Sequence, residues 1–344
     1  MAGYRDQFHL HLGKLSARVP MSALIKISGQ KLIFPVYHLV SDQEVPHINY
    51  LYTVKNSASF LEDLHFLLGH FEPIDLPRVL KHLDGSEPLT RPSFFLTFDD
   101  GLQEFYSIVA PILISLGIPA MNFLNSAFID NHQLFHRYKV SLILHRLAQS
   151  ANPAYVKEIG TLVQTKSNNE DEIKNILLKL NYEDTALIDR LGAIVDLDFN
   201  HFLQSQKPYL SSDQIRELIK KGFEFGAHSI DHPLYGSLPL AEQIRQTDQS
   251  ITAINQEYNL QYRTFAFPFT DFNVSRRFFD YYYHQKPRLD LSFGSAGLKK
   301  DIYHRHLQRI PMEMGSLPAH QIIHAEYLYY LLKQPLGKNK ISRL

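Results

Sequence analysis

Cysteine is absent from the 344-residue sequence, and so is tryptophan. Without cysteine there is no disulfide framework, no thiolate metal site and no cysteine nucleophile. Lysine plus arginine and aspartate plus glutamate number 35 each, so no overall charge favours nucleic acid or an anionic surface as a partner. We therefore expect no nucleic-acid partner, and neutrality leaves other ligands open.

Long hydrophobic runs are also missing. No stretch reaches the ~18 apolar residues that a membrane-spanning helix needs, and residues 1–20 lack the apolar core of a signal peptide. We expect no integral membrane segment and a cytoplasmic location, although a mature chain whose leader was removed has the same pattern. The basic residues near the C-terminus are expected to form a solvated tail rather than a membrane-binding surface. They are Lys333, Lys338, Lys340 and Arg343.

The stretch Ser-Phe-Phe-Leu-Thr-Phe-Asp-Asp-Gly at residues 93–101 is the most informative in the chain. Its apolar run predicts a strand buried on both faces, as in a parallel sheet. The strand ends at Asp99 and Asp100, and α/β folds carry their chemistry at the carboxyl ends of such strands. Two adjacent desolvated carboxylates favour a nearby cation, for which a metal ion is suitable. Taken alone, an Asp-Asp-Gly turn that closes a strand explains these residues more simply.

A second predicted strand, from residue 223, leads to His228 and His232. If the chain turns helically after Ala227, the two imidazoles share one face, about 5–6 Å apart at Cβ, which suits one metal ion. Two histidines and a carboxylate are the ligand set of a catalytic rather than a structural metal site. The spacing alone is weak evidence, because two further histidine pairs share it. These pairs are His132/His136 and His320/His324.

Together the two stretches resemble the signature motifs of the polysaccharide deacetylase family, carbohydrate esterase family 4, also called the NodB-homology domain. Residues 97–101, Thr-Phe-Asp-Asp-Gly, and residues 228–233, His-Ser-Ile-Asp-His-Pro, match the family patterns T-F-D-D-G and H-S/T-x-x-H-P in order. Residues 210–222 resemble the helix before the second motif. Residues 265–269, Phe-Ala-Phe-Pro-Phe, resemble the motif that forms one wall of the family's groove. The similarity covers roughly residues 33–130 and 208–311.

The resemblance implies a distorted (β/α)7 barrel, in agreement with the alternation of predicted strands and helices. We expect one catalytic domain over residues 1–344, with a helical insertion at about residues 130–208. The insertion either shapes or covers the substrate groove, or it is a peripheral bundle without a catalytic role. The first barrel strand is predicted over residues 31–39, and a helix kinked at Pro111 over residues 102–116.

For the site, the resemblance implies that Asp100, His228 and His232 bind a divalent metal ion, with zinc expected, and that Asp99 is the general base. A bound metal ion lowers the pKa of water from 15.7 toward ~7 and so supplies hydroxide near neutrality. The implied reaction removes an N-acetyl group from a carbohydrate, either an amino-sugar polymer or a glycan precursor, and releases acetate.

The resemblance also implies a backbone N–H that holds the oxyanion after the groove motif, which points to Phe269 beside Pro268. His38 belongs to a Tyr-His pair that many relatives carry, so it is a candidate for the lining of the site. A lone histidine at a strand end is nevertheless more often a surface or supporting group.

The sequence departs from the family pattern at several places. Ala266 stands where an arginine commonly pairs with the base, and Arg309 is the candidate replacement from another strand. Thr270 replaces a glycine of the groove motif, and the family's usual tryptophan is missing. No Leu-x-His motif supplies the general acid. Five histidines compete for that role: His284, His304, His306, His320 and His324.

Two other functions stay open. The same fold hosts hydrolysis of non-sugar carbon–nitrogen or amide bonds. Alternatively, the chain is a catalytically inactive relative that binds carbohydrate. The missing arginine and acid favour this last reading, whereas the intact acidic pair and both histidines of the second motif oppose it.

Overall fold

The computed structural model describes residues 8, 19–150, 152–165, 169–285 and 289–343, so most of residues 1–20 lie outside it. Within these residues the centre is an eight-stranded parallel sheet with the order β10-β9-β8-β7-β6-β5-β2-β11. The strands are β2 (Pro35–Tyr37), β5 (Leu96–Asp99), β6 (Ala120–Leu124), β7 (Glu224–Ala227), β8 (Thr264–Ala266), β9 (Leu291–Gly294), β10 (His306–Gln308) and β11 (Ile310–Pro311).

The two edge strands of this sheet are consecutive parts of one segment. β10 pairs with β9, β11 pairs with β2, and only Arg309 separates them. The N–H of Arg309 donates to the carbonyl of Gly294, and the N–H of Ile310 donates to the carbonyl of Phe34. Residues 306–311 therefore close the sheet and together occupy a single strand position. The predicted distorted (β/α)7 barrel is confirmed.

The strands are buried on both faces, which explains why their sequences are continuous apolar runs rather than alternating patterns. Inside the barrel an aromatic cluster fills the space between strands, and side chains of α4 (Leu76–Leu83) join it. The buried residues of this cluster include Phe34, Phe95, Met121, Phe123, Leu291 and Phe293. The outward faces of the strands pack against the surrounding helices in a larger core that includes Phe98, Phe225 and Phe265.

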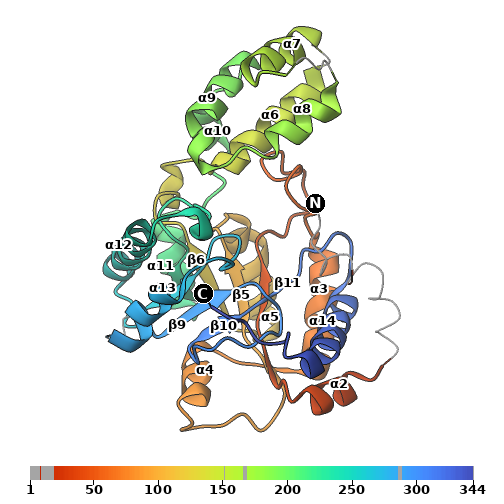
Figure 1. Ribbon diagram of the computed structural model, residues 1–344, viewed down its shortest axis with the longest axis vertical. Helices are drawn as coiled ribbons and strands as arrows, with labels where there is room; N and C mark the ends of the chain where they lie inside the picture. The colour runs from red at the N-terminus through yellow and green to blue at the C-terminus, as the bar shows by residue number, and fades with distance from the viewer. Residues whose placement is uncertain (1–7, 9–18, 151, 166–168, 286–288, 344) are drawn as a thin grey trace.

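Helices surround the barrel (Figure 1), and the chain also forms a small second sheet. The helices are α2 (Met21–Ser28), α3 (Ser57–His70), α5 (Ala110–Leu116), α11 (Ser212–Lys220), α12 (Leu240–Tyr258), α13 (Arg276–Asp280) and α14 (Ala319–Lys333). The sheet has the order β1-β4-β3, with β1 (Leu32–Ile33), β3 (Glu72–Pro73) and β4 (Ser93–Phe94). No helix in the described ranges is long and apolar enough to cross a membrane.

Two predicted elements differ from the structure. The strand expected over residues 31–39 is divided at Phe34, because β1 and β2 belong to different sheets. The helix expected over residues 102–116 begins as a π-helical turn, Phe105–Val109, and continues as α5. Pro111 has no N–H to donate, so a change of hydrogen-bond pattern just before it costs little. The irregularity thus precedes Pro111 instead of being a kink at it.

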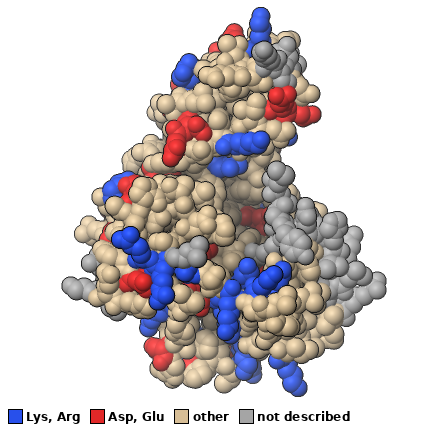
Figure 2. Space-filling view, in the orientation of Figure 1, with Lys and Arg blue, Asp and Glu red and all other residues tan. Residues whose placement is uncertain are grey.

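Between β6 and α11 the chain leaves the barrel, and we call residues 136–206 the helical lobe. In its described residues the lobe contains α6 (His136–Ser150), α7 (Pro153–Leu162), α8 (Glu170–Leu177), α9 (Thr185–Ile194) and α10 (Phe199–Gln206). These helices share a core of their own that includes Ile143, Ile159 and Ile188. Figure 1 shows the lobe projecting from one end of the barrel, and Figure 2 shows acidic and basic side chains interspersed over this face.

Candidate active site

The candidate site residues gather at one end of the barrel. Asp99 is the last residue of β5 and Asp100 follows it, His228 follows β7, and His38 follows β2. Arg309 lies between β10 and β11. Because parallel strands end at the same rim of a barrel, residues that are far apart in sequence meet there.

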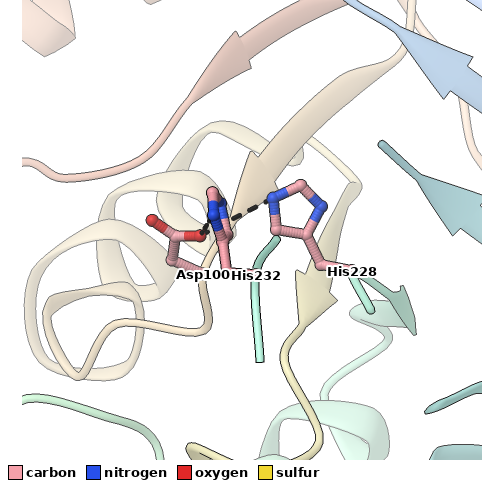
Figure 3. A group of neighbouring side chains, drawn as sticks. All are labelled: Asp100, His228 and His232. Atoms are coloured by element: carbon pink, nitrogen blue, oxygen red, sulfur yellow. Dashed lines mark ion pairs between the residues drawn. The ribbon is translucent and has the colours of Figure 1, made fainter. Parts of the chain in front are cut away.

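Asp100, His228 and His232 form a buried group at this rim. Asp100 Oδ1 lies 3.3 Å from His232 Nε2 and 3.6 Å from His228 Nε2. The centroids of the two imidazole rings are 4.8 Å apart. Figure 3 shows the three side chains pointing toward one another, with Asp100 coming from the end of β5 and the histidines from the chain after β7. The structure therefore brings the three expected metal ligands together.

The chain does not turn helically after Ala227, the condition considered for a shared face, because residues 228–234 form an irregular loop. Ser229 and His232 have positive φ angles of 71° and 64°. The Ser229 hydroxyl accepts a hydrogen bond from the His232 N–H at 3.0 Å, and Asn125 donates to the carbonyl of His228. These side-chain contacts hold a backbone conformation that costs roughly 1–2 kcal/mol per residue. The irregular loop of residues 228–234, and not a helical turn, therefore brings both imidazoles to the same side as Asp100.

The donor set fits a divalent metal ion. Asp100 Oδ1 and His228 Nε2 are buried and have no hydrogen-bond partner among the described residues, which is costly unless a ligand satisfies them. His228 Nδ1 lies 2.8 Å from the carbonyl of Ala266, so it carries the proton and Nε2 presents its lone pair to the group. The Tyr138 hydroxyl donates to Asp100 Oδ2 at 2.9 Å and leaves Oδ1 available.

The protonation states agree with metal binding. Burial lowers the pKa of His228 to about 4, so near neutrality the ring is neutral, which is the form that binds metal ions. Burial alone raises the pKa of Asp100, but the neighbouring His232 outweighs it and holds that pKa well below its usual range. The carboxylate is thus ionised, as a metal ligand must be.

Asp99 pairs with Arg309 in two parallel hydrogen bonds. Arg309 Nη1 lies 2.6 Å from Asp99 Oδ1, and Nη2 lies 2.7 Å from Oδ2. Both side chains are almost fully buried, and the guanidinium also lies over the rings of Phe123 and Phe293. Burial raises the pKa of Asp99, but Arg309 outweighs it and keeps the pKa below the ordinary value. Arg309 therefore reaches the carboxylate to which the family's motif arginine, here Ala266, was expected to bind.

His38 lies beside Asp99 and is paired with Glu313. His38 Nδ1 is 2.5 Å from Glu313 Oε2, and the other oxygen of Glu313 accepts the N–H groups of His38 and Leu39. His38 Nε2 is 4.0 Å from Asp99 Oδ2. Burial lowers the pKa of His38, but the Glu313 carboxylate outweighs it and the pKa is raised to about 9. At neutral pH His38 is an imidazolium beside the carboxylate of Asp99.

Phe269 and Pro268 line the edge of the group. Phe269 has a positive φ of 57°, and its ring centroid lies 4.5 Å from that of His232. The carbonyl of Pro268 accepts the N–H of Thr270 at 2.6 Å, and the carbonyl of Phe269 accepts the Ser295 hydroxyl. In the described part of the chain the Phe269 N–H has no acceptor, so it is available to a ligand.

Four residues at the site were not found from the sequence. Glu313 has no motif around it, and only its place two residues after β11 hints that it lies at the same rim. Tyr138 comes from the start of the helical lobe and Phe135 directly precedes the lobe, and the centroid of the Phe135 ring lies 4.3 Å from that of His232. The Tyr52 ring lies 5.4 Å from that of His38. Aromatic residues such as these are typical of any packed core, so no sequence signal singles them out.

The five histidines that competed for the role of general acid lie elsewhere. None of them contacts Asp99 or Asp100 within the described ranges. His306 is buried against Ser292 and Asp271, His304 contacts the carbonyl of Leu83, His284 pairs with Asp280, and His320 and His324 lie beside Phe66.

A second group of possible ligands, Asp271, Asp301 and His306, is already neutralised by the protein itself. The Arg343 guanidinium lies between the two carboxylates and contacts both, with its side chain only 3% exposed. His306 Nε2 also lies 3.0 Å from Asp271. The expectation that the C-terminal tail is solvated is therefore wrong for Arg343, because its guanidinium lies in a buried ion pair.

Comparison with known proteins decides the family. A family model described as polysaccharide deacetylase matches residues 86–279, which include both signature motifs. The chain belongs to the polysaccharide deacetylase family. As a member of this deacetylase family it is a hydrolase that acts on carbon–nitrogen bonds other than peptide bonds, and the family's substrates are carbohydrates. A search of curated proteins gave no match.

Solved structures, deacetylases among them, share the fold of this family member. The Streptococcus pyogenes deacetylase PplD, in complex with acetate, is 14% identical with a TM-score of 0.54, over 84% of this chain and 96% of that one. IcaB from Ammonifex degensii is 15% identical with a TM-score of 0.53, over 87% and 97% of the two chains. A de-N-acetylase from Aggregatibacter actinomycetemcomitans is 14% identical with a TM-score of 0.53, over 83% and 96%.

Proposed function

We propose that this deacetylase removes N-acetyl groups from amino-sugar units of a polymer or glycan precursor, releases acetate, and depends on a divalent metal ion, with zinc expected. The observation that carries the proposal is the buried group of Asp100, His228 and His232, with unsatisfied ligand atoms, directly beside the Asp99–Arg309 pair. A metal ion held by that group supplies Lewis-acid polarisation of the acetyl carbonyl and lowers the pKa of water toward ~7.

Asp99 is proposed as the general base. Arg309 keeps it ionised and fixes the direction of both carboxylate oxygens, so one of them can accept the proton of the attacking water. The water oxygen forms the new bond to the acetyl carbon. Because Arg309 is buried and bidentate, the base is positioned before substrate binds and does not reorganise during the reaction.

His38 is proposed as the general acid in place of the missing Leu-x-His histidine. Its raised pKa keeps it protonated near neutrality, and its Nε2 faces Asp99 across 4.0 Å. When the carbon–nitrogen bond breaks, the His38 proton goes to the leaving nitrogen, while the proton from water stays on Asp99. Water's second proton leaves with the acetyl group as acetic acid, which ionises to acetate, and the proton held by Asp99 then passes to His38, so that both side chains return to their starting states beside a free amino sugar.

Phe269 is proposed to stabilise the oxyanion through its unpaired backbone N–H. The positive φ at this residue and the preceding Pro268 fix the direction of that N–H. The rings of Phe269 and Phe135 flank His232 on two sides, at 4.5 and 4.3 Å between centroids.

The intact contacts of Asp99 and Asp100 argue against an inactive carbohydrate-binding relative, and no feature of the site specifically favours a non-sugar substrate. The cytoplasmic location, and the single domain over residues 1–344, stay predictions.

The test combines metal content with product formation. Purified protein is assayed by elemental mass spectrometry and by acetate release from N-acetylated amino sugars, beside His232→Ala and Asp99→Asn. We expect near-stoichiometric metal in the parent, loss of metal in His232→Ala, and retained metal without acetate release in Asp99→Asn. His304→Ala, at an exposed histidine remote from the rim, is the matched control and should keep both properties. A parent that binds no supplied zinc, or that releases no acetate when metal-loaded, contradicts the proposal.

A further inference from the structure

The three candidate metal ligands differ in what fixes their side chains. His228 is oriented from the barrel, because its Nδ1 lies 2.8 Å from the carbonyl of Ala266 at the end of β8. His232 Nδ1 is buried and has no hydrogen-bond partner among the described residues. The carboxylate of Asp100 accepts a hydrogen bond from a residue of the helical lobe. Metal ligands depend on such outer contacts for their orientation, so the support of Asp100 and His232 affects how well the group binds an ion.

Tyr138, in the first turn of α6, determines how the Asp100 carboxylate is turned. Its hydroxyl donates to Oδ2 at 2.9 Å, whereas Oδ1 lies 3.3 Å from His232 Nε2 and 3.6 Å from His228 Nε2. Figure 3 shows one carboxylate oxygen facing the imidazoles and the other pointing away from them. The side chain of Tyr138 is buried, and a hydrogen bond to an ionised group is stronger than one between neutral groups. Tyr138 therefore fixes which oxygen is presented to an ion.

Packing replaces the missing hydrogen bond at His232. Its ring lies between two phenyl rings, with centroid distances of 4.3 Å to Phe135 and 4.5 Å to Phe269. The two phenyl rings are not equivalent, because Phe269 is 42% exposed and Phe135 only 4%. A buried ring is restricted by its neighbours, whereas an exposed ring can move away. Phe135 is therefore the more rigid of the two contacts that orient the His232 imidazole.

Both supporting residues belong to one segment, residues 135–138, which we call the entry segment of the lobe. The carbonyl of Phe135 accepts the N–H of Lys139 at 3.1 Å, so Phe135 and Tyr138 are one helical turn apart and lie on the same face. Tyr209, where the chain returns from the lobe, holds both of them. Its hydroxyl accepts the Phe135 N–H at 3.1 Å, and its ring is stacked on that of Tyr138. The entry to and the exit from the lobe thus meet beside the ligands.

We propose that the entry segment positions two of the three metal ligands, Tyr138 through its hydrogen bond to Asp100 and Phe135 through its packing on His232. The inference rests on the proposed function, because it concerns the metal ion that the reaction needs. Both are positioning residues, since each acts through a ligand. The helical lobe is then a structural part of the metal centre and not a peripheral bundle, and tight metal binding requires that its entry segment is folded.

The experiment measures the Kd for zinc of the full chain, stripped of metal and titrated in competition with a chelator of known affinity. Tyr138→Phe removes the hydroxyl and keeps the ring, and we expect the Kd to rise by about 10–100-fold. Tyr155→Phe is the matched control. It removes a tyrosine–carboxylate hydrogen bond of 2.7 Å, to Asp196, within the lobe and away from the ligands, and should keep the parent's Kd. Zinc binding that is unchanged or tighter in Tyr138→Phe overturns the role of Tyr138.

Phe135→Leu tests the second contact independently. It keeps an apolar side chain but removes the ring face against His232, and the Kd for zinc should rise by about three- to ten-fold, the equivalent of one aromatic contact. Acetate release by Tyr138→Phe, lost at limiting zinc, should return as zinc is raised, which a general folding defect would not allow. If the parent binds zinc and both variants bind it as tightly, the inference is overturned and the proposed function is not. A parent that binds no supplied zinc instead contradicts the proposed function.

Discussion

Replacement of Glu313 by glutamine tests whether His38 is the proton donor. Glutamine keeps the size of the side chain and one oxygen that can accept the N–H groups of His38 and Leu39. It removes the negative charge 2.5 Å from His38 Nδ1. The pKa of His38 is about 9 because Glu313 outweighs the opposing effect of burial, so without that charge the pKa should fall to its ordinary value of about 6.5 or below.

A fall of about 2.5 pH units corresponds to roughly 3 kcal/mol of lost stabilisation of the imidazolium. At pH 8 the protonated fraction of His38 changes from about nine-tenths to about one-thirtieth, so kcat should fall about thirty-fold if the proton donor limits the rate. The free energy of unfolding also depends on the protonation of His38. Because folding raises the pKa of His38, its contribution to stability is complete below about pH 6.5 and is lost as the pH rises through about 9.

The assay is the pH dependence of kcat for acetate release from pH 6 to 10, with the free energy of unfolding measured in urea over the same range. We expect the alkaline limb to move from about pH 9 in the parent to about pH 6.5 in Glu313→Gln. The stability difference between the two proteins should shrink above pH 9. Glu158→Gln, an exposed position on α7, is the control. An alkaline limb that stays within about half a pH unit of the parent's in Glu313→Gln would refute the assignment of His38.

Two further predictions concern buried ion pairs. Arg309→Ala leaves the buried Asp99 carboxylate without its partner, so the free energy of unfolding should fall by about 3–5 kcal/mol, and the pKa of Asp99 should rise, moving the acidic limb of kcat to higher pH. Urea unfolding and the pH–rate profile measure both effects, and an acidic limb that does not move argues against Asp99 as the base. Arg343→Ala leaves Asp271 and Asp301 without their shared cation, and we expect a loss of about 2–4 kcal/mol in the same unfolding assay, whereas a change below about 0.5 kcal/mol would mean that the tail is not held by this pair.

The sequence was sufficient for the elements that local pattern determines. β5 with Asp99 and Asp100 at its end, and α11 with the capping box of Ser211 and Gln214, are where the apolar runs and cap residues predict them. The alternation of continuous apolar strands with helices predicts parallel β/α units, whereas the closed (β/α)7 barrel was implied by the resemblance to the family. The strand and the helix depend on neighbours in the chain.

The features that were missed depend on residues that are distant in sequence. The loop from His228 to His232 takes positive φ angles because Asn125, at the end of another strand, holds its backbone. Neither the helix propensity of residues 228–232 nor the spacing of the two histidines reflects the contact with Asn125. The sequence alone therefore could not exclude a helical turn. The pairing of His38 with Glu313 joins the two ends of the chain at one rim, and a single glutamate far from any motif gives no signal of it.

The closing segment of the barrel, residues 306–311, has a consequence for how the protein loses activity. This segment is bonded to β9 on one side and to β2 on the other, and Arg309 extends inward from its midpoint to Asp99. The joint between the first and last strands is thus also the support of the general base. If this joint opens locally under heat or denaturant, Arg309 withdraws from Asp99 while the remaining strands stay paired. Activity is then lost when the barrel opens at this joint, before the protein as a whole unfolds.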